Sequence, residues 1–196
     1  MIISALRPAI VLIVFFTVLT GIALPLGFNS LGAAVLPYQA GGSLIMKGDT
    51  VVGSALIGQV FTSEKYFFGR PSATMNADPA DSTKQVSVPY DASSSGASNL
   101  APTSQALIDR VKADIDAAGP APVPADTVTT SASGLDPHIS PANAARQVAR
   151  VAKARGLREN DVQALLDRQT EGRLFGLIGE PRVNVLRLNL ALDAVQ

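Results

Sequence analysis

The chain has 196 residues, with 16 Lys and Arg balanced by 16 Asp and Glu, a single His and no Cys. Zero net charge provides no field that would attract DNA or RNA, so we expect no nucleic-acid partner. Without Cys there are no disulfides, thiolate zinc sites or Cys nucleophiles, and one His cannot build a metal site that needs two imidazoles. The length suits one domain, with or without an appendage.

The charged residues are unevenly distributed along the chain. After Arg7 the next charged residue is Lys47, so thirty-nine consecutive positions carry no Asp, Glu, Lys or Arg. Residues 47–196 hold 31 of the 32 charged side chains, which is about 21% of that part and close to the value for soluble domains. The chain therefore divides into an apolar leader and a water-facing body.

Residues 9–31 are predicted to form one transmembrane helix in contact with the lipid bilayer. Within residues 9–26 the polar side chains are Thr17 and Thr20, whose hydroxyls can bond to a carbonyl one helical turn earlier. Eighteen helical residues rise about 27 Å, nearly the thickness of the bilayer's hydrocarbon core. The length and composition therefore favour a spanning segment.

Prolines mark both ends of this helix. Pro8 suits the first turn, where its missing N–H costs nothing. Pro25 and Gly27 are expected to kink or end the helix near the far side of the membrane. Residues 32–46 then form an uncharged connector to the body.

Two other interpretations of the leader remain open. A cleaved signal peptide has a shorter apolar region than this one, although Gly32-Ala33-Ala34 is a passable cleavage site. A core helix that is apolar on all sides is not expected beside so small a domain. If the helix spans, the positive charge of Arg7 places residues 1–8 in the cytoplasm and residues 47–196, a single domain, on the periplasmic or extracellular side.

The beginning of the body is predicted to be rich in β-structure. Three short apolar runs separated by turn residues favour strands, at residues 44–46, 50–52 and 55–61. Four of the ten aromatic residues follow closely, and we expect core packing rather than ligand contact from them: Phe61, Tyr66, Phe67 and Phe68.

Two stretches, 71–104 and 119–141, are rich in Pro, Gly, Ser and Thr. The first lacks any periodicity, which is typical of a functional loop or of disorder. Because helical or extended segments flank both, we expect long ordered loops within one domain. The predicted fold is therefore a mixed α+β (α/β) domain with long ordered loops, anchored by one N-terminal transmembrane helix.

Three helices are predicted, over residues 104–118, 140–155 and 160–169. The second has Ser140 as its N-cap and Gly156 after its last turn. The first should bury Leu107, Ile108, Val111 and Ile115, with Arg110, Lys112, Asp114 and Asp116 facing out. The third opens with the capping-box spacing of Asn160 and Gln163. Near the C-terminus, residues 179–193 should form an extended segment followed by a short helix.

Basic residues cover much of the second predicted helix and its end. They are Arg146, Arg150, Lys153, Arg155 and Arg158. A solvated helix face is the expected role, and binding to an acidic partner or to lipid head groups is the alternative.

Ser131, Ser133, Asp136 and His138 contain the residue types of a serine-hydrolase triad. Triad members normally approach from different elements, which eight consecutive residues seldom allow, so we expect a turn there and no catalytic residues. No phosphate-binding glycine loop with an accompanying Lys occurs either. An exported, membrane-anchored serine hydrolase and a cleaved secreted binding protein remain alternatives.

Seven strings together resemble one family, the small C subunit of the Kdp-type potassium-transporting P-type ATPase. They run in the family's order over nearly the whole chain: GSALIGQ (53–59), YFFGRPSA (66–73), SGASNL (95–100), PVPAD (122–126), SGLDPHIS (133–140), RVAKARG (150–156) and VNVLRLNLALD (183–193). Ala97 stands where the family's usual string has its second glycine, and residues 73–94 are longer than in compact relatives.

The resemblance implies a non-catalytic accessory subunit in a complex of the bacterial inner membrane. Its partners would be a channel-like potassium-binding subunit and a P-type ATPase subunit that hydrolyses ATP. The family is described as assisting assembly and as a catalytic chaperone that raises ATP affinity. Because the expected topology places residues 47–196 away from cytoplasmic ATP, we favour an indirect effect on ATP through the ATPase subunit over direct nucleotide contact.

The resemblance also implies candidate residues for contact with the partner subunits. They match the family's motifs and are Gly69, Arg70, Pro71, Ser98, Asn99, Asp136 and Pro137. For the Gly, Pro and Asp residues among them, turn geometry is the more ordinary role. Arg70 is the best candidate for a specific ion pair.

Overall fold

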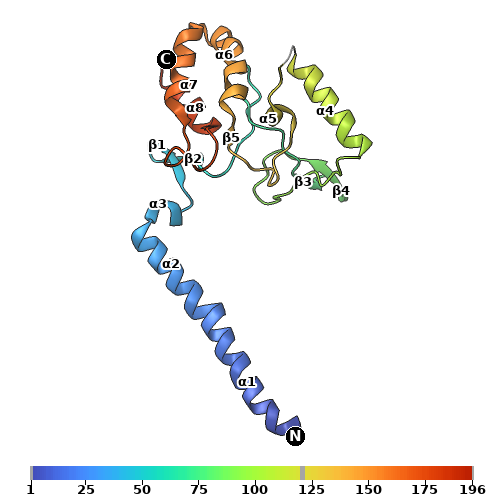
Figure 1. Cartoon of the computed structure of the whole chain (residues 1–196), viewed down its shortest axis with the longest axis vertical. Coiled ribbons are helices and arrows are strands. Elements are labelled where there is room, and N and C mark those ends of the chain that lie inside the picture. The colour runs from blue at the N-terminus through green and yellow to red at the C-terminus, as the bar shows by residue number, and fades with distance from the viewer. Residues whose placement is uncertain (1, 120–121, 196) are drawn as a thin grey trace. The chain divides into compact units, whose positions relative to one another are not determined.

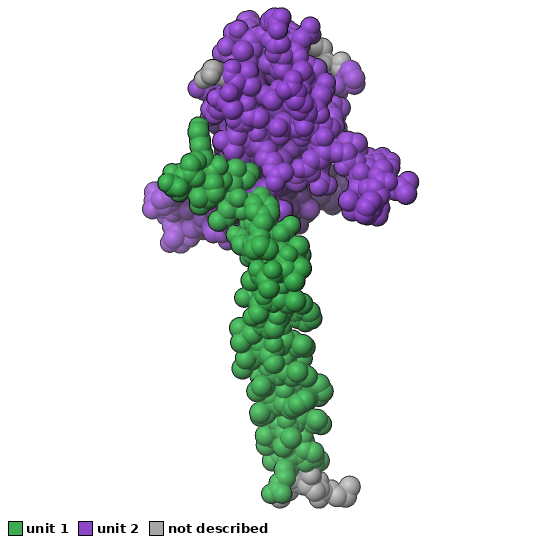
Figure 2. Space-filling model, turned by 90° about the vertical axis from the view of Figure 1, so that its left-hand side faces the viewer, with its two compact units in different colours: residues 1–52 green, residues 53–196 purple. Residues whose placement is uncertain are grey.

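The structure is a computed structural model that describes residues 2–119 and 122–195. The chain forms two compact units, residues 1–52 and residues 53–196, which are coloured separately in Figure 2. The order of helices and strands along the chain can be followed in Figure 1.

Unit 1 begins with one continuous helix. Helix α1 spans Ile2–Val18, the π-helical turn η1 spans Leu19–Ala23, and helix α2 spans Leu24–Val35. The segment Ala5–Val35 is long and apolar enough to cross a membrane. The Thr20 hydroxyl donates to the carbonyl of Phe16 at 2.6 Å, as predicted for a polar side chain in an apolar helix.

Neither Pro8 nor Pro25 marks an end of this helix, although the sequence predicted that both would. The helix does not end at Pro25 or Gly27 but continues to Val35, because the turn before Pro25 is π-helical and the N–H of Leu24 reaches back to Leu19. A widened turn relieves the clash that a proline ring makes in a regular α-helix. Pro8 lies inside α1 rather than in its first turn, since the helix already begins at Ile2.

A short helix and a hairpin complete the N-terminal part of the chain. Helix α3 spans Pro37–Ala40, and strands β1 (Leu44–Lys47) and β2 (Thr50–Ser54) form a two-stranded sheet, which confirms the first two predicted strands. The third predicted strand, residues 55–61, was wrong. Its backbone bonds outside any ladder: the N–H of Gly58 donates to Leu135, and the carbonyl of Ala55 accepts from the Asn184 side chain.

The core of unit 2 consists of three helices packed with a small sheet (Figure 1). The helices are α6 (Pro141–Arg155), α7 (Glu159–Gln169) and α8 (Val185–Asp193), and the antiparallel sheet has the order β5 (His138–Ile139), β7 (Arg182–Asn184), β6 (Thr170–Glu171). The predicted extended segment and short helix near the C-terminus are thus confirmed as β7 and α8. Phe67, Leu188 and Leu192 are among the fully buried side chains.

Local sequence explains the ends of α6. Ser140 accepts a hydrogen bond from the N–H of Asn143, and Gly156 ends the helix in the left-handed conformation with φ of 67°. Both were predicted. The capping box for α7 was wrong, because that helix begins at Glu159, with Arg158 forked onto Asp161 by two bonds of 2.8 Å.

The remaining elements of unit 2 lie in the two long loop regions. An antiparallel hairpin of β3 (Met75–Asp78) and β4 (Asp81–Ser87) occupies part of 71–104, where the sequence predicted no regular structure. Its strands carry mostly polar, exposed side chains, so they lack an apolar pattern. Helix α5 spans Ala125–Val128 within the second stretch.

Helix α4, Gln105–Ala118, has the predicted boundaries but not the predicted faces. Ile108 and Ile115 are exposed, whereas Arg110 and Asp114 are half-buried and pair at 3.2 Å. The Arg110 guanidinium also donates to the carbonyl of Val128. The expectation that Arg110 and Asp114 face solvent was therefore wrong. Arg110 is bonded both to Asp114 and to the backbone of Val128 at the end of α5.

Three arginines of α6 fasten loops of the chain to the helix. Arg146 donates to the carbonyls of Pro122 and Ala118, and Arg150 donates to those of Glu64 and Tyr66. A solvated face was the wrong expectation for these side chains.

Arg155 is the most buried of these arginines. Its side chain is 1% exposed, and it bonds the carbonyl of Lys65 and the carboxylate of Asp193.

The aromatic residues before α6 divide between two roles. Phe67 is fully buried in the core, while the guanidinium group of Arg150 lies 3.9 Å from the ring centre of Phe68.

Candidate functional site

Arg70 and Asp136 form an ion pair in the centre of unit 2. The Arg70 Nη1 and Asp136 Oδ2 atoms are 2.9 Å apart, and both side chains are about three-quarters buried. The other terminal nitrogen of Arg70 contacts the carbonyls of Thr129 and Thr130 at 3.4 Å. The ion pair expected for Arg70 is thus made within the chain, with another residue of the predicted contact set.

Asp136 is held from two sides. One carboxylate oxygen accepts the N–H of His138 at 3.0 Å, and the His138 ring lies 3.5 Å from the same oxygen. Burial alone would raise the pKa of Asp136, but the hydrogen bonds from His138 and Arg70 outweigh it and lower the pKa to about 2. The carboxylate is therefore ionised at neutral pH.

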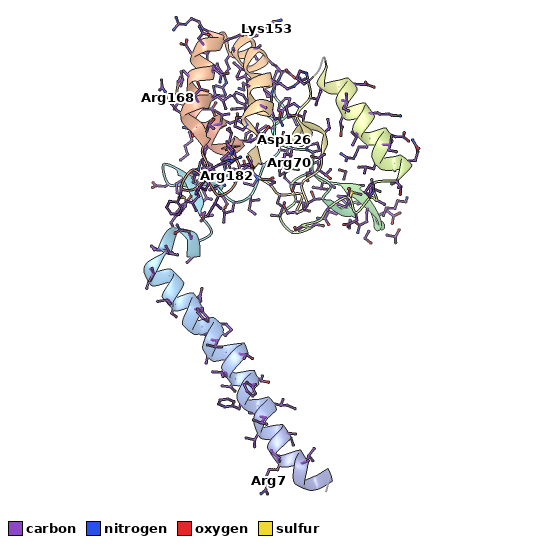
Figure 3. The ribbon with its side chains drawn as sticks, in the orientation of Figure 1. Arg7, Arg70, Asp126, Lys153, Arg168 and Arg182 are labelled. Carbon is purple, nitrogen blue, oxygen red and sulfur yellow. The ribbon has the colours of Figure 1, made fainter. Side chains whose placement is uncertain are left out.

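A cleft of about 720 Å³ lies beside the ion pair. Gly69, Arg70, Pro71 and Ser98 line it, so four of the seven predicted contact residues share one surface. A second depression of about 460 Å³ is lined by Arg70, Asp136 and His138, together with Asp126, which is labelled with Arg70 in Figure 3. Arg70 therefore contributes to both hollows.

The two remaining predicted residues have different surroundings. Asn99 is exposed, and its φ of 52° places it in a left-handed turn. Pro137 is buried, and its carbonyl accepts the N–H of Val185 at 3.0 Å. A left-handed turn thus accounts for the conformation of Asn99, whereas Pro137 is buried and ties its segment to the start of α8.

Tyr90 is a central residue that the sequence did not single out. Its hydroxyl donates to the carbonyl of Arg70 at 2.7 Å, and its ring lies so close to Gly58 and Gly69 that a Cβ at either glycine would overlap it. Burial raises the pKa of Tyr90 to about 12, and the charge of Asp136 acts in the same direction. The glycines flanking the aromatic run were the available sequence clue, since a glycine often marks a close approach.

Hydroxyl groups join the loops that form the cleft wall. The Ser72 hydroxyl donates to the carbonyl of Gly134 at 2.8 Å and accepts the N–H of Tyr90 at 3.0 Å. Thr74 is fully buried and donates to the carbonyl of Val88. Gly134 has φ of 70°, and a Cβ there would overlap the Thr74 methyl group. These contacts order the long loops around the cleft.

Comparison with known proteins identifies the family. The family described as the c chain of the K+-transporting ATPase, KdpC, matches residues 6–194. The chain belongs to the KdpC family. Potassium-transporting ATPase KdpC subunits of Rhodopseudomonas palustris strain BisB5, Bradyrhizobium diazoefficiens and Methylobacterium nodulans are 60%, 59% and 57% identical over 193, 192 and 192 residues, each alignment covering 96% of both chains.

Within this KdpC family member, the hypothetical serine-hydrolase residues do not assemble into a triad. The hydroxyls of Ser131 and Ser133 are 3.1 Å apart, and that of Ser133 accepts the N–H of Leu135. His138 faces Asp136. In the part of the chain that the structure describes, neither serine is hydrogen-bonded to the histidine, so the geometry offers no activated hydroxyl.

The cleft contains two arginines, and each is paired with a carboxylate of the chain, Arg70 with Asp136 and Arg110 with Asp114. Within the part of the chain that the structure describes, the buried Nε atoms of Arg70 and Arg110 have no hydrogen-bond partner. Across residues 2–119 and 122–195 no cluster of three metal-ligating side chains is found.

Proposed function

We propose that the chain is a non-catalytic accessory subunit of an ATP-driven, high-affinity potassium uptake complex, in which it assists assembly and stabilises the complex. The match of the K+-transporting ATPase c-chain family to residues 6–194 carries this proposal. Its partners are a channel-like potassium-binding subunit and a P-type ATPase subunit. The complex resides in the bacterial inner membrane.

The geometry around Arg70 supports a contact surface rather than a reaction centre. The charged groups are paired within the chain, and Tyr90 and Ser72 order the loops around an open cleft. A preorganised surface loses little conformational entropy on binding, which suits an assembly subunit. Gly69, Pro71 and Ser98 on the cleft and the exposed Asn99 supply this surface.

The apolar helix supports membrane anchorage in this proposal. Ala5–Val35 spans the membrane once, with Arg7 and the N-terminus in the cytoplasm and the domain on the other side. The effect on ATP is then indirect: the chain stabilises one conformation of the transporter through the potassium-binding subunit, and the ATPase subunit binds nucleotide. The pairing of both cleft arginines supports this choice over direct nucleotide contact.

Photocrosslinking and co-purification test the proposed assembly. A photoreactive residue at Asn99, beside the cleft wall, is expected to crosslink to the potassium-binding subunit in membranes. A matched probe at Lys153, which is exposed on α6 and outside the predicted contact set, should crosslink far less. Extraction of the chain in mild detergent without either partner subunit would overturn the proposal.

A further inference from the structure

The loop between β6 and β7 carries an exposed apolar tip. Leu174, Phe175, Leu177 and Ile178 form this tip, and they are 59%, 85%, 82% and 64% exposed. Such exposure is unusual for four large apolar side chains within five residues, because water-exposed apolar surface is costly and marks interaction sites.

The backbone of the tip is closed on itself. The N–H of Leu174 donates to the carbonyl of Ile178 at 2.9 Å, and the N–H of Ile178 donates back at 3.0 Å. Two further backbone bonds tighten the same turn: the N–H of Gly176 donates to the carbonyl of Arg173, and the N–H of Leu177 donates to that of Leu174. Backbone groups that are bonded internally can leave water at little cost, which is the condition for entering an apolar phase.

Charged side chains surround the base of the tip and pair with one another. Arg173 pairs with Glu180 at 2.7 Å, and Glu171 pairs with Arg182 at 2.9 Å and with Arg187 at 3.3 Å. The loop is therefore apolar at its end and polar at its base, as amphipathic segments at a membrane surface are.

We propose that the apolar tip inserts into the interfacial layer of the bilayer to which the N-terminal helix anchors the chain, an inference that rests on the proposed membrane anchorage. The tip of a five-residue loop suits the 5–10 Å depth of interfacial segments. The connection favours such contact: residues 36–52 join α2 to unit 2, and seventeen residues reach at most about 60 Å. The domain is thus held at high local concentration beside the membrane.

Lipid explains the composition of the tip better than a protein partner does. Its four side chains carry no hydrogen-bonding group, whereas protein interfaces are anchored mainly by Trp, Tyr and Arg. The residues on either side, Gly172, Arg173 and Gly179 to Pro181, are exposed and not apolar enough to extend the patch. A contact confined to the tip is far smaller than the roughly 800 Å² that each partner contributes to a stable protein interface.

The test uses the absence of Trp from the chain. The full chain with Phe175→Trp is reconstituted into two kinds of phosphatidylcholine vesicle. In one the lipids have ordinary acyl chains, and in the other the acyl chains are brominated. We expect the indole emission to move to shorter wavelength and to be quenched by about half or more in the brominated vesicles, because an interfacial depth brings the ring within reach of bromine. Leu177→Trp provides a second probe, and Ile115→Trp on exposed α4 should remain unquenched.

Flotation of the vesicles separates failure of the anchorage from failure of the insertion. A chain that does not float with the vesicles overturns the anchorage and the inference together. A chain that floats with unquenched Trp at both 175 and 177 overturns the insertion alone. Emission that shifts only after the partner subunits are added, without bromine quenching, assigns the tip to a protein contact and also overturns the inference. The first two results do not depend on whether the complex assembles.

Discussion

Asp136 joins two loops of unit 2 that are 66 residues apart in the chain, since it pairs with Arg70 while bonding the backbone of His138. A depressed carboxylate pKa means that the folded state favours the ionised form. This stabilisation is fully present above the unfolded pKa of 3.8 and is lost as the pH falls through the folded value of about 2.

We therefore expect Asp136→Asn to lower the free energy of unfolding at pH 7 by about 1–2 kcal/mol, a figure reduced for the partial exposure of the pair. The asparagine keeps the acceptor for His138 but loses the charge. Urea unfolding of the detergent-solubilised chain measures the difference, which should shrink between pH 4 and pH 2. Asp81→Asn, in the exposed pair with Lys84, is the control and should leave the free energy of unfolding nearly unchanged, because exposed ion pairs contribute little to stability. A difference that is constant with pH would contradict the assigned role.

Tyr90 packs closely against two glycines, Gly58 and Gly69, and it contacts them through different atoms. A Cβ at Gly69 would meet the Tyr90 hydroxyl, while a Cβ at Gly58 would meet the ring carbons and the carbonyl of Asp136. Removing the hydroxyl should therefore make room at one glycine and not at the other.

Gly69→Ala is expected to destabilise the domain by about 1–3 kcal/mol through overpacking. In the Tyr90→Phe background the same substitution should cost at least about 1 kcal/mol less, whereas the cost of Gly58→Ala should be unchanged. Thermal melts of the four variants and their parents give the two coupling energies. Equal coupling at both glycines would show that the hydroxyl is not the clashing atom.

At the scale of elements, α6 is the helix to which loops are fastened. Its apolar side packs in the core, while Arg146, Arg150 and Arg155 donate to backbone carbonyls of segments that precede it in the chain. Guanidinium groups suit this task because their five N–H donors point in different directions within one plane and can serve separate acceptors.

Arg155→Gln tests this role most directly. Its side chain is 1% exposed and pairs with Asp193 at 2.7 Å. Its removal takes the charged donor from Asp193, which keeps the hydrogen bond from the Tyr66 hydroxyl, and also takes a donor from the carbonyl of Lys65. We expect a loss of about 2–3 kcal/mol in unfolding free energy, below the full value for a buried pair because Asp193 is partly exposed. Lys153→Gln on the same helix should cost under about 0.5 kcal/mol. A similar effect of both substitutions would rule out a specific clamp.

Elements with local determinants were predictable from the sequence, and those with distant partners were not. Ser140 and Gly156 fix the ends of α6 by bonds within four residues, so the prediction there was correct. Residues 55–61 look like a strand, but their backbone bonds to Leu135 and Asn184, which no local pattern reveals. The β3–β4 hairpin is polar on its surface, so it lacks the alternation that identifies a strand.

The candidate site was predictable only in part for the same reason. Arg70 stood out as a charge between aromatic residues and a proline, and the structure supplies Asp136 as its partner. Tyr90 lies twenty residues from Arg70 in an unpatterned loop, so its hydrogen bond could not be inferred. The apolar tip around Phe175 resembles an ordinary short apolar run, and only its exposure reveals it.

For the molecule as a whole, the orientation across the membrane is the property that decides which partners the domain can meet. The chain contains no Cys, so single cysteines can report it without background. We expect Ser82→Cys, on an exposed position of β4 outside the predicted contact set, to react with a membrane-impermeant maleimide added to the periplasmic side of intact inner membranes. Ala5→Cys should react only after the membrane is opened. Labelling of Ala5→Cys alone from outside would reverse the topology and restore direct nucleotide contact as an option.

The π-helical turn at Leu19–Ala23 also has a consequence for helix packing within the membrane. An α-helix turns about 100° per residue, so the extra residue in one widened turn rotates the following half by about that angle. A row of side chains that points in one direction along α1 therefore does not continue in the same direction along α2. Side chains at corresponding positions of the two halves therefore point in different directions, and deleting one residue from this turn would realign them.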